Sequence, residues 1–186
     1  MSDEIRLTEA TSLRAYAHPL RLRLIGLLRA EGPMTATQAA ARLGDTVPNC
    51  SFHLRQLAKY GLAERAPGAD GRERPWRATA QYTSWDDDSA DPAVRAAADQ
   101  LGATIVTDYA RRAQEYLANR AGEPPEWRRA AGLGDALAHV TADELRELTE
   151  QIDALMSRYD DRLTDPARRP AGSRPVQIIR MAVPRD

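Results

Sequence analysis

The sequence contains few of the residues from which disulfides, thiolate metal centres and aromatic cores are built. Its 186 residues include one cysteine, Cys50, so it cannot form an internal disulfide or a site with several thiolate ligands. Aromatic residues make up 5% of the chain, so alanine and leucine must fill most of a core. It has no run of 18 or more apolar residues, which excludes a membrane-spanning helix. Because the mixed, acidic N-terminus also lacks a signal-peptide pattern, we expect a soluble, cytoplasmic protein.

The chain has almost no net charge, but its two halves differ. The formal net charge is −1 at pH 7. Residues 1–85 contain 12 Arg and Lys against 8 Asp and Glu, whereas residues 86–186 contain 14 against 19. Binding of a polyanion is therefore expected in the first half.

Four helices are predicted in the first 60 residues. The first runs from about Glu9 to Ala17 and ends at His18-Pro19, because a residue before proline avoids the helical conformation. The second runs from Pro19 to the break at Gly32-Pro33.

The third and fourth predicted helices are joined by a tight turn. A short helix over 38–43, capped by Thr35 or Thr37, leads through Gly44-Asp45 into a longer helix over 48–60. Two short helices joined in this way form a helix-turn-helix.

A β-hairpin is predicted directly after these helices. Residues 62–65 and 76–82 favour strands, and the segment between them is rich in glycine, proline and aspartate. The order of elements is that of a winged helix, with the wing over 66–77. The predicted fold class is therefore mainly α with a small β-hairpin wing, a winged helix-turn-helix followed by a helical C-terminal dimerisation and accessory region.

The C-terminal half is predicted to be helical and to form a separate region. A long helix over 92–119 has a heptad-like apolar seam, which is typical of a helix that packs against a partner. A capping box at Thr141 opens another amphipathic helix, and residues 127–139 suggest a short one. Residues 176–183 favour a strand added to an existing sheet edge. We expect a DNA-binding domain over 1–85 and a dimerisation and effector region over 86–186.

The predicted helix over 48–60 has a polar face that suits the major groove of DNA. Asn, Gln and Arg side chains pair with base edges, Phe52 can contact a thymine methyl, and Arg55 and Lys59 can hold phosphates. Arginines of the wing tip can contact the flanking backbone or minor groove. The alternative interpretation of both features is an ordinary solvated surface. The candidate DNA-binding residues are Thr46, Val47, Pro48, Asn49, Ser51, Phe52, His53, Arg55, Gln56, Lys59, Arg72, Arg74 and Arg77.

Residues 10–85 resemble the winged-helix transcriptional regulators of the ArsR type. The segments that carry the resemblance are AYAHPLRLRLIGLLRAEGPMTATQAAARLG, TVPNCSFHLRQLAKYGLAE and GRERPWRAT. The resemblance implies a homodimer that binds a pseudo-palindromic operator, with helices 9–17 and 92–119 forming the dimer interface. It also implies DNA contacts at the start and outer face of the recognition helix, at Val47, Pro48, Ser51 and Phe52. We expect a repressor, although the sequence leaves activation open.

The metal-binding motifs of that family are missing. Residues 36–43 read ATQAAARL, without the cysteines of the thiolate-type sensors, and residues 92–119 contain no histidine. We therefore predict no metal and no cofactor. Because no nucleophile–base pattern, phosphate loop or HExxH motif is present either, we predict that the chain is not an enzyme.

Two further interpretations stay open for the sequence. A small organic effector can be placed near Tyr109, Arg112, Tyr116 and Trp127, although aromatic residues at helical spacing more often belong to a core. The second interpretation concerns function: the winged helix is then an interaction module for protein or RNA rather than an operator-binding domain.

Overall fold

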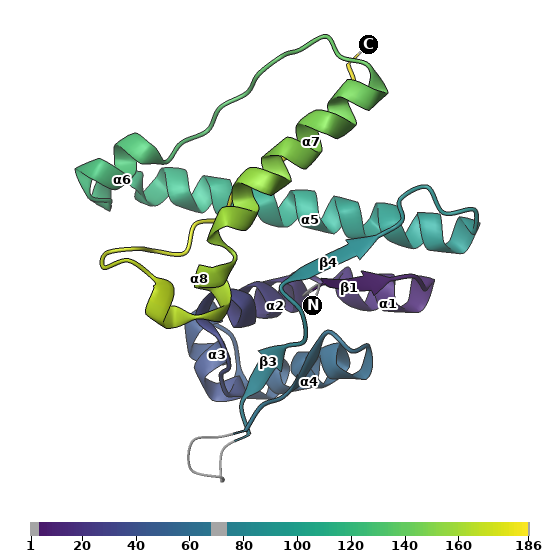
Figure 1. The fold of residues 1–186 in the computed structure, drawn as a ribbon. Helices are drawn as coiled ribbons and strands as arrows, with labels where there is room; N and C mark the ends of the chain where they lie inside the picture. The colour runs from purple at the N-terminus through teal and green to yellow at the C-terminus, as the bar shows by residue number, and fades with distance from the viewer. Residues whose placement is uncertain (1–3, 68–73, 186) are drawn as a thin grey trace. The chain divides into compact units, whose positions relative to one another are not determined.

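The chain divides into two compact units in the computed structural model, which describes residues 4–67 and 74–185. The first unit extends to Gln114 and the second begins at Glu115. Within the described residues the protein is mainly helical, with a small antiparallel hairpin after the helix-turn-helix (Figure 1). This confirms the predicted fold class.

Four helices open the first unit at the positions that the caps predict. They are α1 (Ala10–Tyr16), α2 (Pro19–Glu31), α3 (Ala36–Leu43) and α4 (Val47–Lys59). The start of α2 is fixed by the His18 side chain, which accepts a hydrogen bond from the Leu20 amide at 3.2 Å. At α3, a capping box joins Thr35 and Gln38. Side-chain caps satisfy amides that would otherwise lack partners, so α2, α3 and α4 have a defined first residue, whereas α1 has no side-chain cap.

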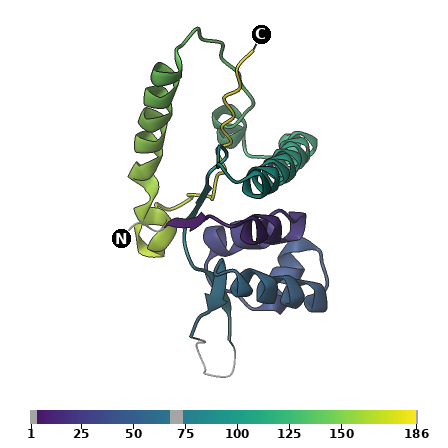
Figure 2. The same cartoon turned by 90° about the vertical axis from the view of Figure 1, so that its right-hand side faces the viewer.

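The hairpin consists of β2 (Ala63–Arg65) and β3 (Trp76–Ala78), which pair antiparallel and lie beside α4 (Figure 2). A bridge between Met34 and Trp76 ties β3 to the segment that follows α2. The predicted second strand, 76–82, is interrupted, because β4 (Tyr82–Trp85) leaves the hairpin.

β4 pairs with a strand that the sequence did not predict. The strand β1 (Glu4–Leu7) lies parallel to β4 in the register Glu4 with Tyr82 and Leu7 with Trp85. Four residues carry too little alternation to predict a strand on their own, and the pairing partner is far away along the chain. This two-stranded sheet ties the start of the chain to the segment after the hairpin.

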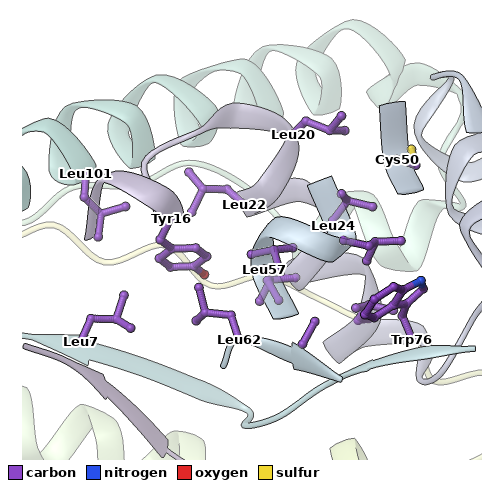
Figure 3. Packing of buried hydrophobic residues seen from close by; sticks show 14 of the residues in the cluster. Leu7, Tyr16, Leu20, Leu22, Leu24, Cys50, Leu57, Leu62, Trp76 and Leu101 are labelled. Atoms are coloured by element: carbon purple, nitrogen blue, oxygen red, sulfur yellow. The ribbon is translucent and has the colours of Figure 1, made fainter. Parts of the chain in front are cut away.

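The long helix α5 (Pro92–Asn119) forms with the predicted bounds, but the first part of its apolar seam packs against the core of the same chain. Val94, Ala98 and Leu101 are buried in the core of the first unit, and Ile105 packs against that core. Figure 3 shows Leu101 among buried residues of α1, α2 and α4. The predicted seam is therefore, over these residues, a core-facing stripe rather than an unfilled surface for a partner.

A buried carboxylate stands on the core-facing side of α5. Asp108 is buried, and its two carboxylate oxygens accept hydrogen bonds from Arg111 at 2.6 Å and from Arg112 at 2.7 Å. A nitrogen of the Arg112 guanidinium lies 3.5 Å from where a Cβ at Gly26 of α2 would stand. The guanidinium that pairs with Asp108 therefore lies next to α2 at Gly26.

Changing Asp108 to asparagine is expected to destabilise the first unit by about 1–3 kcal/mol, because the amide carries no negative charge and has one acceptor oxygen for two guanidinium groups. Urea unfolding followed by circular dichroism measures the change. The control is Asp99→Asn on the exposed side of the same helix, for which we expect about 0.5 kcal/mol or less. Equal stability of the Asp108 variant and this control would contradict a stabilising role for the charge.

The second unit contains α6 (Pro125–Ala130), α7 (Ala142–Met156) and the four-residue α8 (Asp161–Thr164). Short 3-10 helices cover Arg120–Gly122, Ser157–Tyr159 and Pro166–Arg168. The predicted capping box at Thr141 is present. No residue of α7 is buried. Two surface ion pairs connect the segment after Arg168 to earlier residues of this unit. They join Arg174 to Glu123 at 2.6 Å and Arg180 to Asp153 at 2.7 Å.

Two predictions for the second unit are wrong. Residues 176–183 form no strand, although the structure describes all of them. A strand requires a free sheet edge, and β propensity cannot replace that partner. The helix expected over 127–139 ends at Ala130, and the rest of that range is not helical.

The division between the two units does not coincide with the domain boundary predicted between residues 85 and 86. The first part of α5 contributes Val94, Ala97, Ala98 and Leu101 to the core that the winged helix builds. Contacts therefore place the division at 114/115, inside α5.

Candidate nucleic-acid interface

The first turn of α4 is held by side chains at the tight turn before it. Thr46 is the N-cap and accepts a hydrogen bond from the Asn49 amide at 3.4 Å. Asp45 accepts from the Thr46 amide at 2.7 Å and from the Asn49 side chain at 2.9 Å. These bonds, above all the one from Asn49, lower the pKa of the Asp45 carboxyl. The start of α4 is thus fixed in position by neighbours that leave its outer face uncovered.

One side of α4 anchors the helix in the core. Cys50, Leu54 and Leu57 are buried, as their spacing predicts, and Figure 3 shows Cys50 and Leu57 in the same cluster as Leu24 of α2. Burial raises the pKa of the Cys50 thiol. This cysteine is therefore a core residue and lies away from the outer face of the helix.

The opposite side of α4 is open and contains no acidic residue. Phe52 is 48% exposed and Val47 is 41% exposed, which is unusual for large apolar side chains on a helix that has a core to pack into. Polar neighbours surround them. The exposed candidates on α4 and at its cap are Thr46, Val47, Pro48, Asn49, Phe52, Arg55 and Lys59, and Ser51 and Gln56 are half-buried.

Arg55 is held on this face by its own helix. Its guanidinium donates a hydrogen bond to the Ser51 hydroxyl at 3.1 Å, one turn earlier. Lys59 stands a further turn along, with its ammonium 5.5 Å from the centre of the Tyr60 ring. The helix therefore carries two cations on its exposed side.

The hairpin adds arginines next to α4. The Arg65 guanidinium lies 3.8 Å over the Trp76 ring and donates a hydrogen bond to the Arg74 carbonyl. Partial burial lowers the pKa of Arg65, and the positive charges of Arg74 and Arg55 lower it further. The charges of Arg55 on the helix and Arg74 on the hairpin thus both act on Arg65, and we call these three residues the basic cluster. A polyanion would relieve this repulsion.

The other predicted wing arginines have different surroundings. Arg77 is exposed but forms an ion pair with Glu64 at 2.6 Å across the hairpin. Arg72 lies outside the described residues. Arg65 was missed, because it belongs to the first strand rather than to the turn. Its position opposite Trp76 would have identified it, but that position follows only from the register of the hairpin.

His53 is not part of the exposed face, contrary to the face predicted for it from helical spacing, and no contact with DNA is proposed for it. Its side chain is only 7% exposed and its ring lies 4.3 Å from the His18 ring, centre to centre. Arg21 of α2 donates from Nη1 to His53 Nδ1 at 3.3 Å. The helical pattern places position 53 at the border of the buried stripe, and contacts with α2 decide that it turns inward.

The histidine pair makes stability depend on pH. Burial lowers the pKa of both His18 and His53 from the ordinary 6.5, and the charge of Arg21 acts in the same direction. The folded state therefore favours the neutral rings, and the unfolded state binds more protons as pH falls through 6.5. We expect the melting temperature to fall between pH 7.5 and pH 5.5, roughly the range in which histidine titrates.

This expectation is tested with two matched variants. His53→Gln removes one ring of the buried pair, and His139→Gln removes an exposed imidazole in the second unit. Thermal unfolding at each pH should show a shallower pH dependence for His53→Gln than for the wild type or His139→Gln. Three parallel profiles would contradict the role of the buried pair.

The four candidate effector residues fall in different units. Tyr109 and Arg112 belong to the first unit, where burial raises the pKa of Tyr109 and Arg112 pairs with Asp108. Tyr116 and Trp127 belong to the second, where Tyr116 donates to the Ala131 carbonyl at 3.3 Å and the Arg174 guanidinium lies 4.9 Å over the Trp127 ring. Arg112, Tyr116 and Trp127 therefore each have a local structural partner, and Tyr109 is half-buried.

Two kinds of feature are missing from the described residues. No group of three or more His, Cys, Asp or Glu side chains there is arranged to hold a metal ion. Within the same residues, no helix is long and apolar enough to cross a membrane.

The fold and the exposed helix define a helix-turn-helix protein with an adjoining hairpin. Comparison with known families agrees with this class: residues 16–66 match the family model described as a helix-turn-helix domain. The match covers α2, α3, α4 and β2, together with the end of α1. No curated protein matches the chain. A helix-turn-helix domain is a DNA-binding domain.

Proposed function

We propose that this protein is a sequence-specific transcription regulator of the ArsR type that binds double-stranded DNA as a homodimer. The observation that carries the proposal is the exposed face of α4, where Phe52 and Val47 stand open between polar side chains. An apolar group in this setting can contact thymine methyls, while Asn49 and Arg55 can address base edges or phosphates. We place α4 in the major groove.

The hairpin extends the contact to the flanking DNA in this proposal. Arg65 lies close enough to both Arg55 and Arg74 for their charges to interact, so helix and hairpin present one positive surface. Neutralising phosphates releases counterions, so binding should weaken steeply as the salt concentration rises.

A homodimer is supported by a second stripe on α5, on the side away from the core. Ala103, Val106 and Ala110 are all exposed at heptad-like spacing, and Val106 is 50% exposed. Small residues around one larger apolar residue allow two helices to approach closely. A twofold axis there would relate two copies of α4, as an operator with inverted half-sites requires.

Footprinting on the DNA upstream of the protein's own gene tests the proposal. Protection of a short inverted repeat is the expected result. No protection even at low salt would contradict it and would favour the alternative in which the winged helix binds protein or RNA.

A further inference from the structure

A cleft of about 330 Å³ opens in the first unit between α1, α2 and α4, separate from the basic cluster. This volume is in the range of sites that hold small organic molecules. We call it the α1–α4 cleft. The residues that line it are Thr11, Arg14, Ala15, Arg21, Gln56 and Tyr60.

Arg21 is the central polar residue of the cleft, and its hydrogen bonding is incomplete. Its Nε is buried and has no hydrogen-bond partner. Its other two nitrogens donate long bonds to neutral acceptors, 3.3 Å to His53 Nδ1 and 3.4 Å to the Arg14 carbonyl. In the described part of the chain no carboxylate forms an ion pair with Arg21. A half-buried guanidinium without a counter-ion has strong capacity left for an anion.

The other groups around the cleft suit the same ligand. Arg14 stands exposed beside Arg21 and brings a second positive charge. The Gln56 amide and the Tyr60 hydroxyl are further donors, and no acidic side chain lines the cleft. The Thr11 hydroxyl donates a weak bond of 3.4 Å to the Glu9 carboxylate, which an incoming anion would have to displace. Two guanidinium groups with neutral donors are the arrangement by which proteins hold carboxylates and phosphates.

We propose that the α1–α4 cleft binds a small oxyanion, the carboxylate or phosphate group of a metabolite, with Arg21 as its anchor and Arg14 as the second cation. The ligand would complete the hydrogen bonding of Arg21 and compete with His53 for the guanidinium. Because His53 and Gln56 belong to α4, occupancy of the cleft would act on the helix that we place in DNA. This last step rests on the proposed function, whereas anion binding itself does not.

Thermal unfolding of the full chain with millimolar inorganic phosphate or acetate, against sodium chloride of equal ionic strength, tests the binding. Phosphate stabilises many proteins without a site, so the comparison between variants decides. We expect stabilisation of the wild type and of Arg42→Gln, a control on α3. In Arg14→Gln and Arg21→Lys the rise in melting temperature caused by the anion should be at least threefold smaller. Arg14 is exposed, so that variant keeps the test valid if Arg21→Lys does not fold.

Equal stabilisation of all four proteins, or of none, would overturn the proposal.

A second experiment distinguishes a free anion from a DNA phosphate. If phosphate has no effect on the free protein but both cleft variants weaken DNA binding, the cleft holds the DNA backbone and a metabolite site is excluded. If phosphate binds and also changes the DNA affinity of the wild type but not of Arg21→Lys, the coupling to α4 is supported. If the protein binds no DNA at all, the thermal test of anion binding is still valid, because it does not depend on the proposed function.

Discussion

Changing Val106 to glutamate is expected to convert the protein from a dimer to a monomer. Val106 is half exposed in the middle of the apolar stripe on α5, and two copies of a glutamate there would place like charges in a dry interface. A monomer binds one half-site at a time and loses the gain from joining two sites. We therefore expect the affinity for an inverted repeat to fall by about 10²- to 10⁴-fold. Sedimentation equilibrium and fluorescence anisotropy measure the two effects.

The control places the same charge elsewhere on the helix. Gln100 is exposed on the flank of the stripe, so Gln100→Glu should remain dimeric with nearly unchanged affinity. A dimeric Val106→Glu protein would show that the interface lies elsewhere. An unfolded variant would be recognised by circular dichroism, and Val106→Arg with equal charge but opposite sign would then serve as the second test.

Changing Arg55 to alanine is expected to weaken DNA binding by roughly 5- to 150-fold for each protomer, which corresponds to about 1–3 kcal/mol. Arg55 is exposed, is held only by Ser51, and has the charges of Arg65 and Arg74 near it. Its loss should leave the fold unchanged, because none of its contacts is part of the core. Affinity measured as a function of salt also separates the two roles: a lost phosphate contact lowers the slope, whereas a lost base contact changes sequence preference.

Arg146→Ala is the matched control for Arg55→Ala. Arg146 is exposed on α7 in the second unit and pairs only with Asp143, so its removal changes the net charge by the same amount. If Arg55→Ala and Arg146→Ala lower DNA affinity equally, general charge rather than the face of α4 explains the binding.

The sequence predicts those parts of this protein that local chemistry decides. Proline at the start of α2 and threonine caps at α3 and α4 act within a few residues, so the helix bounds follow from the sequence. The same holds for the buried stripe of Cys50, Leu54 and Leu57, because helical spacing alone places these residues on one face.

Features that depend on distant partners could not be predicted. β1 exists because Tyr82–Trp85 lies alongside it, whereas residues 176–183 pair with no strand among the described residues and stay irregular. His53 and Arg65 show the same limit at the candidate interface. Packing against α2 turns His53 inward, and the hairpin register brings Arg65 over Trp76 toward the exposed side of α4.

The central claim is that the open face of α4 reads DNA sequence. Selection of random duplexes by the full chain, carried out in parallel with wild type and with Phe52→Ala, tests it most directly. Phe52 is exposed and its removal takes no side chain from the core, so the variant should fold. The wild type should enrich an inverted repeat, and Phe52→Ala should lose preference at thymine positions in each half-site. Enrichment of the same sequences by both proteins, or of none at low salt, would contradict the claim.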